Sequence, residues 1–269
     1  MACRKAYRAQ AIVKQAEVEP AASISQPTVA KSVDRLLFGV DSKTQASDLL
    51  QNNIDQFEWV ARNKTYPNFY GRYLTGENAL TKQEILFLHL RACKIAAIYA
   101  DDGDKQTEQQ GALLAKKIDI RAMELGIPEQ SVIFLELGEN EYVSRDFMKG
   151  YASALMAEGF TPGFKANTDA KFMFDREFSR GMQTDKAVFE KCLIWAVSPT
   201  LKDYNGMTTT HLIHPDNWAP FAPSALTRRE IAIWQYGVEC HPIEDDTGKL
   251  TTFNLDLVRN DGVIIDKLF

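Results

Sequence analysis

Short apolar runs alternate with longer amphipathic stretches through the first part of the chain. Each run has the length of a strand and is rich in β-branched and aromatic residues, and apolar residues recur at helical spacing in the stretch after it. The runs lie at 36–42, 69–75, 94–100, 131–137 and 161–168. Strand and helix alternating in this way predict a parallel sheet with helices packed outside it. We expect these runs to form five consecutive parallel strands, with the loops after them on one rim.

The pattern changes in the second half of the chain. The runs 192–199, 231–237 and 251–258 still predict strands, but no long helical face lies between the first two. Helix signals are clear earlier, where Thr81 and Glu84 form a predicted capping box and Gly126 marks a helix end. The prediction for residues 33–269 is an α/β fold, a modified TIM (β/α) barrel with helices reduced or missing in its second half.

The segment 1–32 differs from the rest, because it combines Ala, Gln, Glu and Ser with two prolines and shows little apolar periodicity. This composition predicts an N-terminal arm, partly disordered or with one short helix, that can be removed with little loss of stability. Its basic residues are not followed by an apolar core of about 7 to 15 residues, so no intact signal peptide is visible. A cytoplasmic location and export by a non-classical route both stay open.

Composition narrows the classes of function. The 269 residues include 31 Lys and Arg against 36 Asp and Glu, for a net charge of -5, so the basic stripe typical of nucleic-acid binding is missing. No apolar run approaches the roughly 20 residues of a membrane span. The four cysteines contain no CxxC pair, and His211 and His214 lack the geometry of a helical ligand pair. No motif for a cofactor or metal is present, and none is expected.

Acidic residues lie where the predicted strands end. Asp41 ends the first run, Asp101 and Asp102 follow the third, and Glu136 ends the fourth. The carboxyl ends of barrel strands form the rim on which such enzymes build active sites. Two carboxyl groups there can act as general acid/base and partner, which predicts a catalytic Glu136 with a raised pKa and a nucleophilic or electrostatic Asp41. The alternative is that these acids are helix caps or solvated loop residues.

Other polar and aromatic residues on the strands are candidates for substrate binding. A buried Arg72 requires an anionic partner, for which Glu136 or Asp41 is available, and it could orient substrate or form a structural ion pair. Aromatic faces and nearby amides suit carbohydrate rings, although aromatic residues on strands are also common in cores. The remaining candidates for substrate binding are Tyr73, Asp101, Asp102, Asn167, Trp195, Trp234, Gln235 and Asp256.

The strand sequences together resemble a known family. GVDS, GRYLT, IAAIY, VIFLE, GFKANT, IWAVSP and IWQYG follow one another between about Leu36 and Val258. In this order they resemble the bacterial glycoside-hydrolase-like domain of unknown function, a group related to the family 25 glycoside hydrolases, the lysozyme-like muramidases. The resemblance implies a modified TIM barrel whose later strands lack full helices, and cleavage or recognition of cell-wall glycans.

The resemblance also assigns residues. Asp41 matches the acid of the family's first strand, and Glu136 matches the glutamate of its Asp-x-Glu pair on the fourth. The first acid of that pair is Phe134 in this chain, and Asp256 looks like the acid of the family's terminal segment. The hypothesis is therefore a glycoside hydrolase acting on peptidoglycan or another polysaccharide, with weak turnover and a sugar pocket walled by Trp195 or Trp234. The alternative is a catalytically inactive barrel that binds glycan or a protein partner. The sugar, the linkage and the oligomeric state stay open.

Overall fold

Eight strands close into one barrel in the computed structural model, which describes residues 35–50, 53–63, 65–201, 215–240, 252–260 and 264–269. Neighbours in the barrel follow the order of the chain, and β1 meets β8. The strands are β1 Leu36–Ser42, β2 Phe69–Tyr73, β3 Lys94–Tyr99, β4 Val132–Glu136, β5 Thr161–Ala166, β6 Leu193–Leu201, β7 Ile231–Cys240 and β8 Phe253–Arg259.

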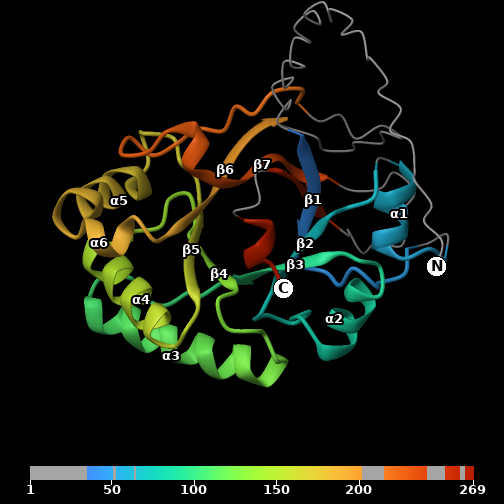
Figure 1. The fold of residues 1–269 in the computed structure, drawn as a ribbon, viewed down its shortest axis with the longest axis horizontal. Helices are drawn as coiled ribbons and strands as arrows, with labels where there is room; N and C mark the ends of the chain where they lie inside the picture. The colour runs from blue at the N-terminus through green and yellow to red at the C-terminus, as the bar shows by residue number, and fades with distance from the viewer. Residues whose placement is uncertain (1–34, 51–52, 64, 202–214, 241–251, 261–263) are drawn as a thin grey trace, which may run out of the picture. The chain divides into compact units, whose positions relative to one another are not determined.

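Figure 1 labels the strands β1 to β7 of the barrel, and β8 differs from them in direction. Strands β1 to β7 pair in parallel, whereas β8 runs antiparallel to both β7 and β1. The pairing of β8 with β1 extends from Leu36 opposite Arg259 to Asp41 opposite Asn254. The prediction of five consecutive parallel strands in the first part of the chain is confirmed.

Helices cover only part of this barrel. They follow the first five strands as α1 Gln56–Asn63, α2 Lys82–His89, α3 Glu108–Leu125, α4 Arg145–Ala157, α5 Met173–Thr184 and α6 Lys186–Phe189. Among the residues described after β6, the helical segments are two 3₁₀ turns, Arg228–Glu230 and Ile265–Lys267. The expected reduction of helices in the second half is therefore confirmed for this part of the chain.

Helix ends follow local sequence signals. Gly126 adopts a left-handed φ of 75° and ends α3, as its lack of a side chain allows. Thr81 accepts a hydrogen bond from the Glu84 backbone N–H at 3.1 Å, which caps α2. The reciprocal half of the predicted capping box is wrong, because the Glu84 carboxylate turns to Arg72 and to the Ala46 N–H instead.

Alternation along the strands divides the core into two layers. One layer fills the barrel with Phe69, Phe134, Trp195 and their neighbours, and the other lies between the barrel and the helices. The C-terminal segment closes the bottom of the barrel, where Leu268 joins the inner layer and the backbone of Phe269 pairs with Ile95 at 2.7 and 3.2 Å. The polar residues of the inner face therefore lie at the other end of the barrel, near the carboxyl ends of the parallel strands.

Several sequence-based expectations concern residues outside the described ranges. The arm at 1–32 and the pair His211 and His214 are among them, so the arm stays a prediction.

Cys93, Cys192 and Cys240 are buried free thiols. No helix in the described part of the chain has the length and hydropathy of a membrane-spanning segment.

Candidate functional site

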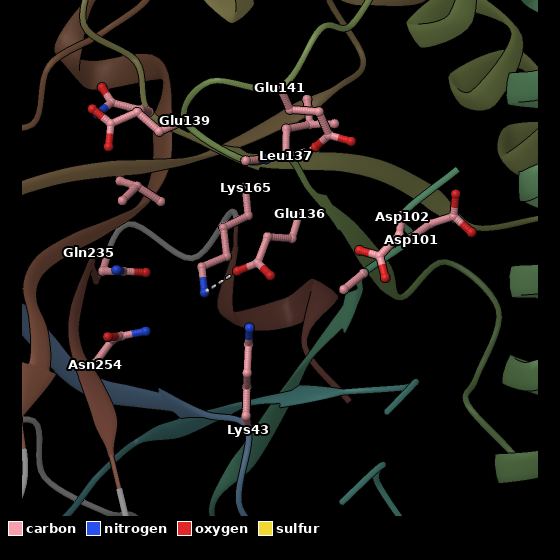
Figure 2. A pocket seen from close by; sticks show the side chains of 14 residues that line it. Lys43, Asp101, Asp102, Glu136, Leu137, Glu139, Glu141, Lys165, Gln235 and Asn254 are labelled. Atoms are coloured by element: carbon pink, nitrogen blue, oxygen red, sulfur yellow. Dashed lines mark hydrogen bonds and ion pairs between the residues drawn. The ribbon is translucent and has the colours of Figure 1, made fainter. Parts of the chain in front are cut away.

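A polar cavity of about 470 Å³ opens at the carboxyl ends of the strands (Figure 2). A second cavity of about 440 Å³ lies beside it, and Lys43, Ala100 and Asp102 line both. Glu136, Lys165, Gln235 and Asn254 reach the first cavity from β4, from β5, from β7 and from β8, and Tyr73 reaches the second from β2. The predicted rim is therefore hollow and lined by residues from separate strands.

Lys165 lies at the centre of the polar cluster beneath this cavity. Its Nζ contacts Asp41 Oδ1 at 2.7 Å, the Tyr73 hydroxyl at 3.1 Å and Glu136 Oε1 at 3.3 Å. Only 2% of its side chain is exposed. Burial by itself would lower the pKa of Lys165, but Asp41, Tyr73 and Glu136 together outweigh it and raise this pKa well above its ordinary value. Lys165 is therefore a fixed cation, held by both candidate catalytic acids.

Glu136 is the member of the cluster that faces the cavity, with 26% of its side chain exposed. The Tyr73 hydroxyl donates a hydrogen bond to its Oε1 at 2.6 Å. Burial works to raise the pKa of Glu136, but Lys165, the Tyr73 hydrogen bond and Lys43 shift it below its ordinary value. The raised pKa expected for a general acid is therefore wrong, because the sequence did not show the cation next to this carboxylate.

Asp41 and Asp256 form a second acidic pair below Lys165. Both are fully buried on the inner face of β1 and β8, where Asp256 lies opposite Gly39, two residues before Asp41. Oδ1 of Asp41 is bound by Lys165 and by Asn254 Nδ2 at 3.0 Å, and Oδ1 of Asp256 accepts a 2.9 Å hydrogen bond from Trp195. Their Oδ2 atoms have no hydrogen-bond partner among the residues that the structure describes.

A proton on one of these two buried carboxyl groups removes the repulsion between two negative charges. Burial and the negative charge of Asp41 raise the pKa of Asp256 well above its ordinary value. A protonated Asp256 can donate to the Asp41 carboxylate, which then pairs with Lys165. The acid at this place in β8 thus supports Asp41 from below and does not reach the cavity, contrary to its expected role in substrate binding.

Arg72 also differs from its expected placement. Its side chain lies outside the barrel wall, where Nε and Nη2 contact the Glu84 carboxylate at 2.6 and 3.2 Å and Nη2 donates to the Asn78 carbonyl at 2.7 Å. The expectation that Asp41 or Glu136 pairs with Arg72 is wrong. Adjacent strand residues point to opposite faces, and Tyr73 points inward, so Arg72 points outward. Arg72 forms a buried structural ion pair between the barrel and α2.

The expected aromatic walls are wrong for the described part of the cavity. Trp195 is fully buried in the barrel interior, with Phe134 packed against it at 5.2 Å between ring centroids. Trp234 points to the outer face, where its indole N–H donates to the Ser198 carbonyl at 3.0 Å. Phe134 therefore forms part of the floor under Lys165 and does not line the opening itself.

The other predicted residues do meet at the rim. Asp101 and Asp102 after β3, Asn167 after β5 and Gln235 on β7 all line the first cavity. Lys165 was not among the predicted residues. Its signal was present in GFKANT, where a lysine sits between buried neighbours at an inward position. No cluster of three or more His, Cys, Asp or Glu side chains suitable for a metal occurs among the residues that the structure describes.

Known structures share this fold. An uncharacterized protein from B. stearothermophilus superposes with a TM-score of 0.68 at 22% identity, over 87% of this chain and 100% of that one. A lysozyme from Streptomyces coelicolor (TM-score 0.51, 10% identity, 86% and 96% covered) and a muramidase from Acremonium alcalophilum (0.50, 11%, 85% and 96%) are also similar. No protein-family model and no curated protein matches the sequence. The similarities confirm the modified barrel fold that the strand motifs imply.

Proposed function

We propose that the protein is a glycoside hydrolase that acts on a polysaccharide, with cell-wall peptidoglycan as the first substrate to test. One observation carries the proposal: two carboxylates meet at the rim of a barrel of this fold. Asp41 Oδ1 and Glu136 Oε1 contact the same Lys165 nitrogen at 2.7 and 3.3 Å, so they lie at most 6.0 Å apart. Lys165 and the buried Asp41 thereby hold one accessible carboxylate, Glu136, at the rim, where glycosidases use a carboxylate in catalysis.

The two carboxylates have different parts in this proposal. Glu136 reaches the cavity and is held ionised, so it suits a nucleophile or a stabiliser of the positive charge that develops on the sugar. Asp41 is fully buried and acts through Lys165 as a positioning residue. The proton for the leaving group then comes from another rim carboxyl, for which Asp101 and Asp102 are available in the cavity wall.

Glycan binding without cleavage is the second candidate. It is favoured by Lys165, whose charge offsets that of the carboxylates, and by Phe134, which takes the place of an acid on β4. In this case Glu136 accepts hydrogen bonds from sugar hydroxyl groups and no bond is broken.

Reducing-end release from purified peptidoglycan and from a panel of polysaccharides separates the two candidates. Wild type, Glu136→Gln and the control Glu190→Gln are compared, since Glu190 is exposed and precedes β6 at the opposite end of the barrel. Slow release that Glu136→Gln abolishes and Glu190→Gln preserves supports the hydrolase. Binding without release supports the second candidate, and the absence of both contradicts the two together.

The pH profile supplies a separate check on Glu136. Because its pKa is lowered, the active ionised form should persist below the ordinary glutamate range. Activity should therefore keep its acidic limb at unusually low pH. An acidic limb at or above the ordinary glutamate pKa of about 4.3 would contradict the assigned role.

A further inference from the structure

The wall of the first cavity carries an excess of negative charge. Five carboxylates line it, against the ammonium groups of Lys43 and Lys165, and one of the five, Glu141, is paired with the buried Lys105. Lys165 is already held by Asp41 from below, so it adds little positive charge to the opening. Asp102 and Glu139 have no hydrogen bond or ion pair to any residue that the structure describes. A ligand with anionic groups is therefore disfavoured here, and a cationic one is favoured.

An independent feature of the same wall points to a ligand that donates hydrogen bonds. Gln235 is only 4% exposed and lines the cavity, yet its buried Oε1 has no hydrogen-bond partner among the residues that the structure describes. Figure 2 shows its amide facing Lys165 and Glu136 across the cavity. A buried carbonyl without a donor is unfavourable, and a ligand that supplies an N–H or O–H removes this penalty.

The neighbouring amide groups are already engaged. Asn254 donates to Asp41 and accepts from the Glu239 N–H at 3.0 Å, and the carbonyl oxygen of Asn167 accepts from the Asp169 N–H at 3.0 Å. Gln235 thus provides an open acceptor in the wall of the same cavity as the unpaired carboxylates, and Figure 2 shows it across the cavity from Asp102. An amino sugar can satisfy both features, because its hydroxyl groups donate hydrogen bonds and its ammonium group carries a positive charge with three donors.

We propose that this cavity binds a glycan unit with a free protonated amine, a 2-amino sugar that lacks its N-acetyl group. This inference rests on the proposed function and names its substrate class. The ammonium group is attracted by the negative charge of Asp102 and Glu139 in the cavity wall, while a hydroxyl group of the sugar donates to the Gln235 carbonyl and the ring extends toward Glu136. The second cavity, which shares Lys43 and Asp102, leaves room for a neighbouring sugar of the same chain.

The test is calorimetric titration of the full chain with two tetrasaccharides of equal length. One is the glucosamine tetramer with free amines and the other is the N-acetylglucosamine tetramer. At a pH where the amines are protonated, the free-amine tetramer should bind at least tenfold more tightly, and the preference should shrink when raised pH removes their charge. Tighter or equal binding of the acetylated tetramer would overturn the proposal and leave glycan binding itself intact.

Variants assign any preference to these residues. Asp102→Asn and Glu139→Gln should each reduce the preference roughly fivefold, since each removes one negative charge from the cavity wall. Gln235→Met should weaken binding of the free-amine tetramer about tenfold. Glu190→Gln, an exposed site at the other end of the barrel, should change neither. An unchanged preference in the Asp102→Asn/Glu139→Gln double variant would contradict the placement.

Peptidoglycan and chitosan are two sources of such an amine. Binding to de-N-acetylated peptidoglycan is compared with the same sample after chemical re-acetylation, and with chitosan. Loss of binding after re-acetylation assigns the preference to peptidoglycan amines, and binding to chitosan alone assigns it to the other polymer. If neither acetylated nor free-amine glycans bind, the proposed function fails together with this inference.

Discussion

Replacement of Lys165 by methionine tests the polar cluster most directly. The variant Lys165→Met keeps the length of the side chain and removes its charge. Asp41 then remains fully buried and has no cation beside it among the described residues. The 3.0 Å hydrogen bond from the neutral Asn254 amide and the proton on Asp256 are left to stabilise its charge. Glu136 is less affected, because it is partly exposed and keeps its hydrogen bond from Tyr73.

The expected loss of stability follows from these contacts. Removal of one partner from a buried ion pair costs about 3 to 5 kcal/mol, because the other charge is left without compensation. Most of this loss of stability comes from Asp41, and the partly exposed Glu136 adds roughly 1 kcal/mol or less. The raised pKa of Lys165 means that its stabilising effect is fully present at neutral pH and is lost only as the pH rises through that pKa. At pH 7 we therefore expect Lys165→Met to be about 3 to 5 kcal/mol less stable.

Urea denaturation followed by tryptophan fluorescence measures this loss at pH 7 and pH 4. In the variant the penalty should be smaller at pH 4, where the unpaired carboxylates take up protons. The double variant Lys165→Met/Asp41→Asn should recover at least half of the loss, since both buried charges are gone. A loss below about 1 kcal/mol at pH 7, or one that does not depend on pH, would refute the assigned geometry.

Three further predictions concern other parts of the barrel. Asp256→Asn should be tolerated, because an amide can donate to Asp41 as the protonated acid does. Since the pKa of Asp256 is raised, the wild type should lose stability as the pH rises above about 3.9, whereas the variant should not. Melting curves recorded from pH 4 to pH 7 measure this difference. Gly150→Ala should cost about 1 to 3 kcal/mol in urea denaturation, because its Cβ would lie 2.0 Å from a carbonyl oxygen of α3. Arg72→Leu should cost about 3 to 5 kcal/mol by leaving Glu84 unpaired, yet glycan affinity per folded molecule, measured by calorimetry, should stay unchanged because Arg72 faces away from the cavity.

The period of two along strands explains which parts of the site the sequence could predict. Asp41 and Glu136 end their strands at inward positions, so their meeting at the rim followed from a parallel barrel. The same rule excluded one of the neighbours Arg72 and Tyr73, since adjacent residues point to opposite faces. Lys165 obeys the rule as well, so its inward position on β5 follows from the same alternation.

Contacts between distant strands could not be derived in this way. The proximity of Asp41 and Asp256 depends on β8 being antiparallel to β1 and on the register of their pairing. Neither follows from the apolar pattern of 251–258, which is the same for either direction. The lowered pKa of Glu136 could not be predicted for a related reason, because it depends on a lysine brought close by a different strand.

The pairing of β1 with β8 also has a consequence for the order of folding. These strands are separated by most of the chain, so the barrel can close only after β8 has formed. Until then β1 and β7 are both open sheet edges with unpaired backbone groups, and such edges promote aggregation. During synthesis from the N-terminus, β8 is made after the other strands, so the edge of β1 that pairs with β8 stays unpaired until then. Late closure of this kind predicts slow folding and a dependence on chaperones when the protein is expressed rapidly.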